Sequence, residues 1–399
     1  RIPSRWPHRF IRDMPAAVCT REEELHWLAL RMVPSLGARR AGQLIERFQT
    51  PQAVFRASVS QLEAAGLLPG VARSIASGCA FEDAAVQQEK LLATGAVAIP
   101  LTDPRYPPRL REIFDPPMVL FARGRTELLG SLMIAMVGTR RPTPYGVAVA
   151  ERLAADLGRA GLTIASGMAR GIDTAAHRGA LDAGAGTVAV FGCGVDVVYP
   201  AENRRLAVEL AEKGLLISEF PMTTPAYPQN FPIRNRIVSG MGVGVVVVEG
   251  AQYSGSSITA RLALDQGREV FAVPGNITSK VSWGPNLLIK QGAKLIQDFS
   301  DVLEELLPED RRRLVEEMRV RCGVATPDED AQQPLPLGPM NEIARKLLAS
   351  LSVDTTTHID EVLERVENCS SSEIIAAMFE LELLGLVKQL PGRNFVKVW

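Results

Sequence analysis

The chain has 399 residues, with 44 Lys and Arg against 45 Asp and Glu, so its formal net charge is −1. This balance excludes binding of nucleic acid through a globally basic surface, and any positive field must be local. Five scattered cysteines without a CxxC pair argue against a disulfide framework or zinc site and fit a cytoplasmic protein, and no apolar run of about 18 residues predicts a membrane span. The basic, proline-containing segment 1–21 lacks a secretion signal and is expected to be a disordered extension.

Short helices joined by glycine-containing turns are predicted over 22–99. The stretch 33–41 and a looser copy at 65–72 each place an apolar residue and a glycine just before a helix. This pattern is typical of SAM-like and helix-hairpin-helix domains, in which backbone N–H groups at a helix N-terminus hold a DNA phosphate. A plain helical bundle with glycine turns explains the pattern equally well.

The next segment, 100–124, is rich in proline and looks irregular. Leu110, Ile113 and the run 119–121 make it too apolar for a free linker. We therefore predict a connector that packs on the following domain and forms its lead-in.

From 132 to 307, short β-rich runs alternate with helical patterns such as Tyr145–Ala160 and Ser257–Gln266. The predicted strands are Met133–Val137, Leu162–Ala165, Thr187–Phe191, Leu215–Ile217, Val243–Val248, Glu269–Val273 and Lys294–Ile296. Several are continuous apolar runs, as in strands that are buried on both faces. The alternation predicts an α/β domain over 100–307 with an extended Rossmann-like, doubly wound and mostly parallel sheet.

The last part of the chain begins with a charged and then proline-rich segment, 308–340, which we predict to be a flexible linker. Three helical patterns follow, over Ile343–Leu351, His358–Val366 and Ser372–Leu384. Two alternating runs around Pro391 and Gly392 then predict a β-hairpin. Helices followed by a hairpin indicate a winged-helix domain over 341–399.

Polar residues follow several predicted strands, at the sheet edge where open parallel sheets bind ligands. After the first strand, Gly138 and Thr139 allow a tight turn, and Arg140 is placed to clamp a phosphate. The alternative is an ordinary surface arginine. A hydroxyl, two glycines and an arginine form an anion nest after the second strand: Ser166, Gly167, Arg170 and Gly171. We interpret Asp173 as a helix cap and His177 as a buried structural histidine.

Two further groups belong to the same edge. The first combines an aromatic ring with an amide and two arginines: Phe231, Arg234, Asn235 and Arg236. A ring that stacks a base and cations that hold the backbone suit a single strand, although core packing and ion pairing are the alternatives. The second opens a helix with hydroxyls suited to phosphate, or merely to capping: Ser254, Gly255 and Ser256. Because all four groups fall at one sheet edge, we predict one nucleic-acid site.

Motifs for common cofactors are missing. Gly192-Cys193-Gly194 lacks the third glycine of a dinucleotide fingerprint, and the sequence contains no GxxxxGK[ST] segment. We predict no cofactor, no metal and no catalytic residue.

The motifs, taken in order, resemble the bacterial DNA-processing protein A family, also called Smf. The resemblance spans Tyr106 to Asp298, and it rests on the segments Val137–Arg140, Ser166–Asp173 with His177, Tyr199-Pro200, Ser218-Glu219, Phe231–Arg236, Ser254–Ser256 and Gly292-Ala293. It implies a non-catalytic recombination mediator that binds incoming single-stranded DNA, protects it and loads the RecA recombinase in natural transformation. By the same resemblance, the DNA contacts and the phosphate pocket come from the four groups above. One departure is that 225–230 contains no lysine, whereas some members place one before the Phe-Pro pair.

The resemblance also implies partners. These are RecA, single-strand-binding protein and a second copy of the chain, because the family forms dimers through the Rossmann-like domain. The segment around Leu287, Leu288 and Ile289 would lie near the dimer contact.

Two other functions stay open. Related Rossmann-like phosphoribohydrolases carry a Pro-Gly-Gly-x-Gly-Thr-x-x-Glu loop, which is missing here, although Glu249 is a conceivable base. The winged helix could instead make the protein a sequence-specific transcription regulator or a protein-docking module. Its wing carries only Lys388, Arg393 and Lys397.

Overall fold

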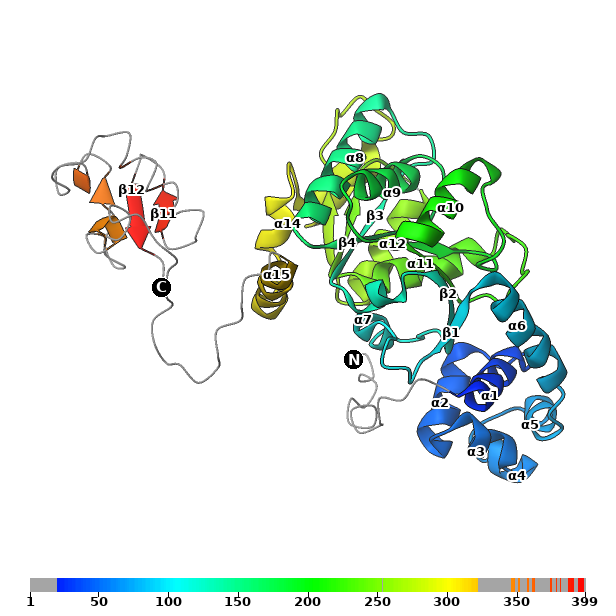
Figure 1. Cartoon of the computed structure of the whole chain (residues 1–399). Coiled ribbons are helices and arrows are strands. Elements are labelled where there is room, and N and C mark those ends of the chain that lie inside the picture. Colours follow the sequence, from blue (N-terminus) through cyan, green and yellow to red (C-terminus); the bar gives the residue numbers. More distant parts are fainter. Residues whose placement is uncertain are drawn as a thin grey trace. The chain divides into compact units, whose positions relative to one another are not determined.

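The computed structural model describes residues 20–252 and 254–321, and in the C-terminal part residues 346–348, 351, 357–358, 361–362, 374, 378, 381, 387–390 and 394–397. Most of the predicted N-terminal extension therefore lies outside the described residues. The chain divides into two units, Arg1–Val324 and Ala325–Trp399, and each is described by itself (Figure 1).

Helices form the first part of the larger unit, as predicted. They are α1 (Arg21–Met32), α2 (Ala38–Phe48), α3 (Pro51–Arg56), α4 (Val59–Glu63), α5 (Pro69–Ala76) and α6 (Phe81–Thr94). Thr20 and Glu23 form a capping box that fixes the start of α1. Leu28, Leu44 and Ile75 are fully or almost fully buried and belong to the same apolar core as one face of the sheet. The helical segment thus packs on the sheet and has no separate core.

The described part of the larger unit contains one nine-stranded sheet, in the order β1-β2-β6-β5-β4-β3-β7-β8-β9. The strands are β1 (Val97–Pro100), β2 (Val119–Gly124), β3 (Met133–Val137), β4 (Thr163–Ser166), β5 (Thr187–Phe191), β6 (Leu215–Ser218), β7 (Gly244–Val247), β8 (Glu269–Ala272) and β9 (Lys294–Leu295). Strands β3 to β9 pair in parallel, so the seven predicted strands and the mostly parallel α/β fold are confirmed.

The prediction of an irregular connector over 100–124 was wrong in one respect, because this segment contains the strand β2. β2 pairs antiparallel with β6, and β1 pairs antiparallel with β2. The boundary expected between 99 and 100 therefore cuts through β1. Between the two strands, the short helix α7 (Pro108–Arg111) buries Leu110. The apolar residues of this segment are buried as predicted, but their strand pairing is long-range and is invisible in the local pattern.

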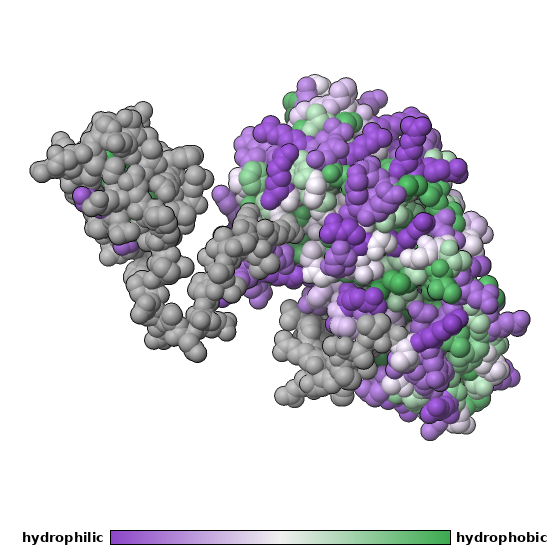
Figure 2. Space-filling model, viewed as in Figure 1, coloured by the Kyte–Doolittle hydropathy of each residue, from purple (hydrophilic) through white to green (hydrophobic). Residues whose placement is uncertain are grey.

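Helices cover both faces of the sheet (Figure 1). Met133 and Ala135 of β3 share an apolar core with residues of α11 (Asn230–Met241) and α12 (Gly255–Asp265). Ile134 and Met136 point to the other face, where they share a second core with α8 (Pro144–Arg159) and α9 (Ile172–Asp182). The remaining elements up to 305 are η1 (Thr126–Gly130), η2 (Ala201–Asn203), α10 (Arg204–Lys213), α13 (Trp283–Lys290) and α14 (Ser300–Glu304). Hydrophilic side chains predominate on the outer surface over α8 and α9 (Figure 2).

The strand order reverses at β3. The chain runs outward from β3 through β4, β5 and β6, and then returns to β7 on the other side of β3. Connections that diverge in this way leave a crevice at the carboxyl ends of the two neighbouring strands, where open α/β sheets bind ligands. The fold therefore places a site above β3 and β7.

The first part of the predicted linker is a helix, α15 (Pro308–Arg321). Leu314 is buried in the core that α8 and α9 share, and Asp310 accepts a 2.6 Å ion-paired hydrogen bond from Arg109. The prediction of a flexible linker was wrong for 308–321, because one apolar residue and one buried acid attach this charged helix to the core. The proline-rich remainder lies outside the described residues.

In the smaller unit, a three-stranded sheet has the order β10-β12-β11, from β10 (Thr357–His358), β11 (Val387–Leu390) and β12 (Asn394–Lys397). The hairpin predicted around Pro391 is confirmed by the pairing of β11 with β12. His358 was expected to begin a helix but lies in β10, because its backbone pairs with Asn394. None of the described helices has both the length and the apolar composition needed to cross a membrane.

Candidate functional site

A groove of about 640 Å³ opens at the carboxyl edge of the sheet. It is lined by residues 137–141 after β3, by Ala169 and Asp173 after β4, by residues of α11 and by 254–256 at the start of α12. A smaller and more enclosed cavity of about 60 Å³ shares Arg140, Phe231 and Arg234 with the groove. The four predicted groups of residues therefore meet at one place.

Backbone contacts hold the loops of the groove together. The amide of Thr139 donates to the carbonyl of Glu249 at 2.7 Å, and the amide of Ile172 donates to the carbonyl of Thr139 at 3.2 Å. A Cβ on Gly138 would lie 2.6 Å from Cγ1 of Ile172 and 2.8 Å from the Glu249 carbonyl oxygen. Glycine is therefore required at 138 because three loops converge on its backbone.

Glu249 has a structural role in this arrangement. Its carboxylate is buried and accepts hydrogen bonds from the Thr143 amide at 2.9 Å and the Thr143 hydroxyl at 2.6 Å. Thr143 is the N-cap of α8, so Glu249 holds the start of that helix. It does not line the groove, which leaves a general-base role without support.

Two exposed arginines follow β3. Neither Arg140 nor Arg141 forms an ion pair with any residue that the structure describes. The Cζ atom of Arg140 lies 5.9 Å from the centre of the Phe231 ring. The wall of the groove thus carries positive charge that no carboxylate of the described residues neutralises by direct contact.

Phe231 forms one side of both cavities. Its half-buried ring lies against Gly192, where a Cβ would approach Cδ1 of the ring to 2.8 Å. The ring of Tyr199 lies 5.4 Å away and is tilted by 40°, and Tyr199 is 47% exposed. Tyr199 was not among the predicted site residues. The signal was there, because the Tyr199-Pro200 pair is one of the ordered motifs.

Arg234 is buried at the floor of the groove, with 5% of its surface exposed. Its Nε atom has no hydrogen-bond partner among the described residues. A Cβ on Gly167 would lie 1.6 Å from Nη1, so the absence of a side chain at 167 makes room for the guanidinium. Burial lowers the pKa of Arg234, and the nearby carboxylate of Asp173 opposes that shift. Arginine stays charged even so, and it needs an anion here.

Asp173 and His177 support this floor from α9. The Asp173 carboxylate accepts from the amides of Gly167 and Ala169, at 3.1 and 3.2 Å, whereas the N-cap of α9 is Gly171. Asp173 therefore fixes the preceding loop rather than capping the helix as predicted. Burial raises its pKa, and Arg234 opposes the rise. His177 is fully buried, as predicted.

The hydrogen bonds of His177 fix its tautomer. The Thr187 hydroxyl donates to the carbonyl of Ile164 and therefore accepts from Nδ1 of His177, at 2.7 Å. Nε2 is then an acceptor, and it has no partner among the described residues. Burial, assisted by Arg234, lowers the pKa of His177 to about 3, so its ring is neutral.

Arg236 is not brought to the groove. Its guanidinium donates to both carboxylate oxygens of Glu219, at 2.6 and 2.8 Å, and to Asp115 at 2.9 Å. It is 8% exposed and lines neither cavity. Its predicted contact with DNA is not supported by this placement, because its charge is already neutralised inside the protein.

Three residues of the predicted anion nest make contacts within the protein, and two of these three do not remain at the site. The Ser166 hydroxyl is buried and donates to the carbonyl of Met136 at 2.6 Å. Gly171 has a φ of +79° and makes a turn against Thr139, outside the lining of both cavities. Arg170 lines the smaller cavity, but it is exposed and ion-paired with Glu202 at 2.5 Å. Of this nest, Gly167 and Arg170 remain at the site.

The start of α12 forms part of the groove wall. Ser254 is the N-cap but makes no side-chain capping hydrogen bond, and its hydroxyl lies 2.6 Å from that of Ser256. Ser254, Gly255 and Ser256 all line the groove. Capping alone therefore does not explain the first serine. Asn235 lines the groove as well.

The segment predicted to form a dimer contact lies on α13, outside the groove. Leu287, Leu288 and Ile289 are half-buried, and Leu288 packs against the core. Among the described residues, no three His, Cys, Asp or Glu side chains are grouped as metal ligands would be.

Two protein-family models together match most of the chain. A family described as DNA recombination-mediator protein A matches residues 97–307, and the DprA winged helix domain matches residues 327–393. Protein Smf of Escherichia coli is 40% identical over 302 residues, which cover 74% of this chain and 75% of that protein. DNA processing protein DprA of Bacillus subtilis is 46% identical over 213 residues, which cover 53% of this chain and 72% of that protein.

A solved structure shows the same architecture. The crystal structure of DNA processing protein A from Streptococcus pneumoniae superposes with a TM-score of 0.62 at 33% identity. The superposition covers 71% of this chain and 98% of the other. The winged-helix prediction is confirmed by the family match over 327–393.

Proposed function

Because the chain belongs to the DNA recombination-mediator protein A family, we propose that it binds single-stranded DNA in the groove and mediates recombination without catalysing a reaction. One observation carries the proposal. Arg140, Arg141 and the buried Arg234 line the groove without an ion pair to any described residue, beside the rings of Phe231 and Tyr199. Cations for the backbone and rings for the bases are what a single strand requires.

The finer role follows from the family name and the site together. We propose that the bound strand is incoming DNA, that the protein protects it, and that it delivers the strand to the RecA recombinase in natural transformation, with single-strand-binding protein as a further partner. Strand-exchange assays with RecA, on DNA first coated with single-strand-binding protein, test this role. No acceleration of RecA loading would contradict it.

A nucleotide-processing enzyme is the second candidate, and the geometry disfavours it. Glu249, the base that the sequence suggested, has both carboxylate oxygens engaged by Thr143 and lies outside the groove lining. We expect no release of free base from nucleoside monophosphates. Release that is abolished in Glu249→Gln would overturn the proposal in favour of the enzyme. A regulator that reads duplex DNA through its winged helix would instead bind duplex more tightly than single strands.

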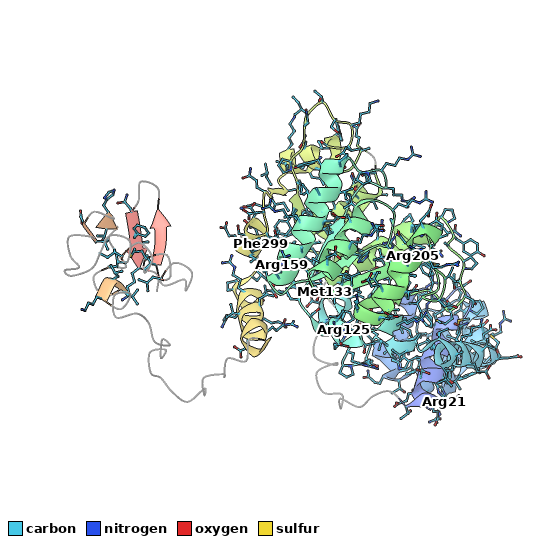
Figure 3. All side chains as sticks on the ribbon, turned by 45° about the horizontal axis from the view of Figure 1, so that its top comes forward. Arg21, Arg125, Met133, Arg159, Arg205 and Phe299 are labelled. Atoms are coloured by element: carbon cyan, nitrogen blue, oxygen red, sulfur yellow. The ribbon has the colours of Figure 1, made fainter. Side chains whose placement is uncertain are left out.

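The decisive experiment compares two variants in a salt titration with single-stranded DNA. Arg140→Ala should flatten the slope of log affinity against log salt by about 0.7, the value for one released counterion on a single strand. Phe231→Ala should cost about 1–3 kcal/mol of binding and leave the slope unchanged. Arg159→Gln, on an exposed residue at the far end of α8 (Figure 3), is the control and should match the wild type.

Tighter binding of duplex than of single strands by the wild type would contradict the proposal. So would an Arg140→Ala protein with unchanged affinity and slope. Circular dichroism must first show that both variants are folded, because Phe231 also packs against Gly192.

We propose in addition that two copies associate through α13. Leu288 packs against the core, so a charge there would confound folding with assembly. Ile289 is half-buried and is not part of that packing, so Ile289→Glu is the cleaner test. Light scattering should show a dimer in the wild type and a monomer in the variant, since a desolvated charge disfavours the contact. A folded variant that remains a dimer would exclude this surface.

A further inference from the structure

The smaller cavity has the features of a site for one compact anion. It shares Arg140, Tyr199, Phe231 and Arg234 with the groove, and adds Gly167 and Arg170 from the loop after β4. Its volume is about 60 Å³. The groove is about ten times larger, so the smaller cavity suits one compact group such as a phosphate.

The floor of this cavity is built around an arginine that lacks a partner. Arg234 is 95% buried, and its Nε makes no hydrogen bond with a described residue. A buried cation without a counter-ion is costly unless a ligand supplies the missing charge. Asp173, the nearest acid, already accepts hydrogen bonds from the amides of Gly167 and Ala169. Arg234 is therefore held ready for an anion that arrives from outside.

The charge balance favours a doubly charged anion. Arg140 and Arg234 line the smaller cavity without an ion pair to a described residue, and its described lining contains no carboxylate, since Asp173 lines only the larger groove. Arg170 does not alter the balance, because Glu202 neutralises it. Two positive charges thus remain uncompensated. A phosphodiester within a strand carries one negative charge, and a terminal phosphate monoester carries close to two at neutral pH.

The shape of the cavity also favours a terminal phosphate over a phosphodiester within a strand. A phosphodiester inside a strand has a nucleotide on each side, so two lengths of chain would have to leave the cavity. The rings of Phe231 and Tyr199 stand 5.4 Å apart at one wall, and the Gly167–Arg170 loop forms another. A terminal phosphate needs one connection only, so it can enter while its nucleotide stays in the groove.

We propose that this cavity is an end-recognition site, in which Arg234 and Arg140 bind the terminal phosphate monoester of a DNA strand. The inference rests on the proposed function, since it requires that the strand lies in the groove. It makes Arg234 a residue that distinguishes a phosphorylated strand end from a hydroxyl end.

The test measures how the full-length protein binds short oligothymidylates that differ only at one end. The ends are a phosphate, a hydroxyl and a methyl phosphate, which keeps the phosphorus but carries a single charge. Each is placed at the 5′ end in one series and at the 3′ end in another. The quantity of interest is the ratio of the hydroxyl-end to the phosphate-end dissociation constant.

We expect the phosphorylated strand to bind roughly tenfold more tightly at one end or at both, and the methyl phosphate strand to bind like the hydroxyl strand. Tenfold corresponds to about 1.4 kcal/mol, close to the lower range for a hydrogen bond to a charged group. Arg234→Gln should bring the ratio to one, whereas Arg159→Gln should leave it unchanged.

A second variant keeps the proposal testable if Arg234→Gln does not fold. In Gly167→Ala, the new methyl group would lie 1.6 Å from Nη1 of Arg234, so it displaces the guanidinium without removing its charge. It should also bring the ratio toward one.

The possible failures are distinguishable. Equal affinity of the wild type for all three strands overturns end recognition and leaves single-strand binding intact. Tight binding of the methyl phosphate strand overturns the assignment of a doubly charged ligand. Failure of the wild type to bind any of the strands contradicts the proposed function, and the inference with it.

Discussion

The two sides of α11 show how one helix provides both a binding residue and a structural one. Arg234 and Arg236 are two residues apart, and positions i and i+2 of a helix do not face each other. Arg234 turns toward the groove, and its buried Nε atom has no hydrogen-bond partner in the part of the chain that the structure describes. Arg236 turns the other way and is buried between Glu219 and Asp115.

The difference teaches that burial by itself does not identify a structural arginine. Both side chains are more than 90% buried. What separates them is whether the protein supplies the counter-ion. Burial lowers the pKa of both, but Glu219 and Asp115 reverse that effect for Arg236 and raise its pKa overall. An uncompensated buried cation indicates a ligand, and a compensated one indicates a structural role.

The largest expected effect concerns Arg236. Arg236→Gln leaves the buried carboxylate of Glu219 without its cation, so the free energy of unfolding should fall by about 3–5 kcal/mol. Urea denaturation measures this change. Joint replacement of Arg236 and Glu219 by leucine should recover part of the loss, because the buried carboxylate is removed with its cation, while Arg31 loses its interaction with that carboxylate. A stable Arg236→Gln protein with weakened DNA binding would reverse the comparison.

Arg234→Gln should behave in the opposite way. Arg234 forms no ion pair or hydrogen bond with a described residue and interacts with Asp173 only at longer range, so its removal should lower the free energy of unfolding far less than Arg236→Gln does. Affinity for end-phosphorylated single-stranded DNA should fall roughly tenfold, close to the lower range of about 1.5–3 kcal/mol for a hydrogen bond to a charged group. Fluorescence anisotropy at fixed salt measures the affinity. Loss of stability with unchanged affinity would show that Arg234 serves the fold.

His177 on α9 tests whether burial, assisted by the nearby Arg234, keeps a further positive charge out of this region. Its pKa is lowered to about 3, so between pH 6.5 and pH 3 the unfolded chain binds the proton that the folded protein rejects. The free energy of unfolding therefore falls as the pH drops below 6.5, by about 2 kcal/mol at pH 5.

His177→Gln should lose this part of the pH dependence, which urea denaturation at pH 7 and pH 5 measures. Burial raises the pKa of Asp173, whose protonation stabilises the folded state at low pH, but both proteins contain it and its effect cancels. Identical pH profiles would contradict a neutral, buried His177.

The smallest expected effect concerns Arg170. Its charge is neutralised by Glu202 in an exposed ion pair, so Arg170→Ala should weaken DNA binding by less than about fivefold. Glu202→Gln, which frees Arg170, should strengthen binding slightly. A loss in Arg170→Ala as large as that in Arg234→Gln would show that ion pairing does not decide which arginines bind.

The local pattern of the sequence was sufficient for the elements of the sheet. Continuous, mostly apolar runs such as Met133–Val137 and Thr187–Phe191 are typical of strands buried on both faces, and their bounds agree with β3 and β5. The four polar groups were predicted to meet because the carboxyl ends of parallel strands share one edge. The order of the motifs identified the family, which the comparisons confirmed.

Only the tertiary structure decided which of the predicted residues face the groove. The sequence shows Arg234 and Arg236 as equivalent, and the distinction depends on Glu219 and Asp115, which lie 17 and 121 residues away. The same holds for β2, whose pairing with β6 is long-range, and for α15, which one leucine and one aspartate attach to the core. The local pattern of apolar residues predicts which side chains are buried. Counter-ions and strand partners come from distant parts of the chain, so folding alone brings them together.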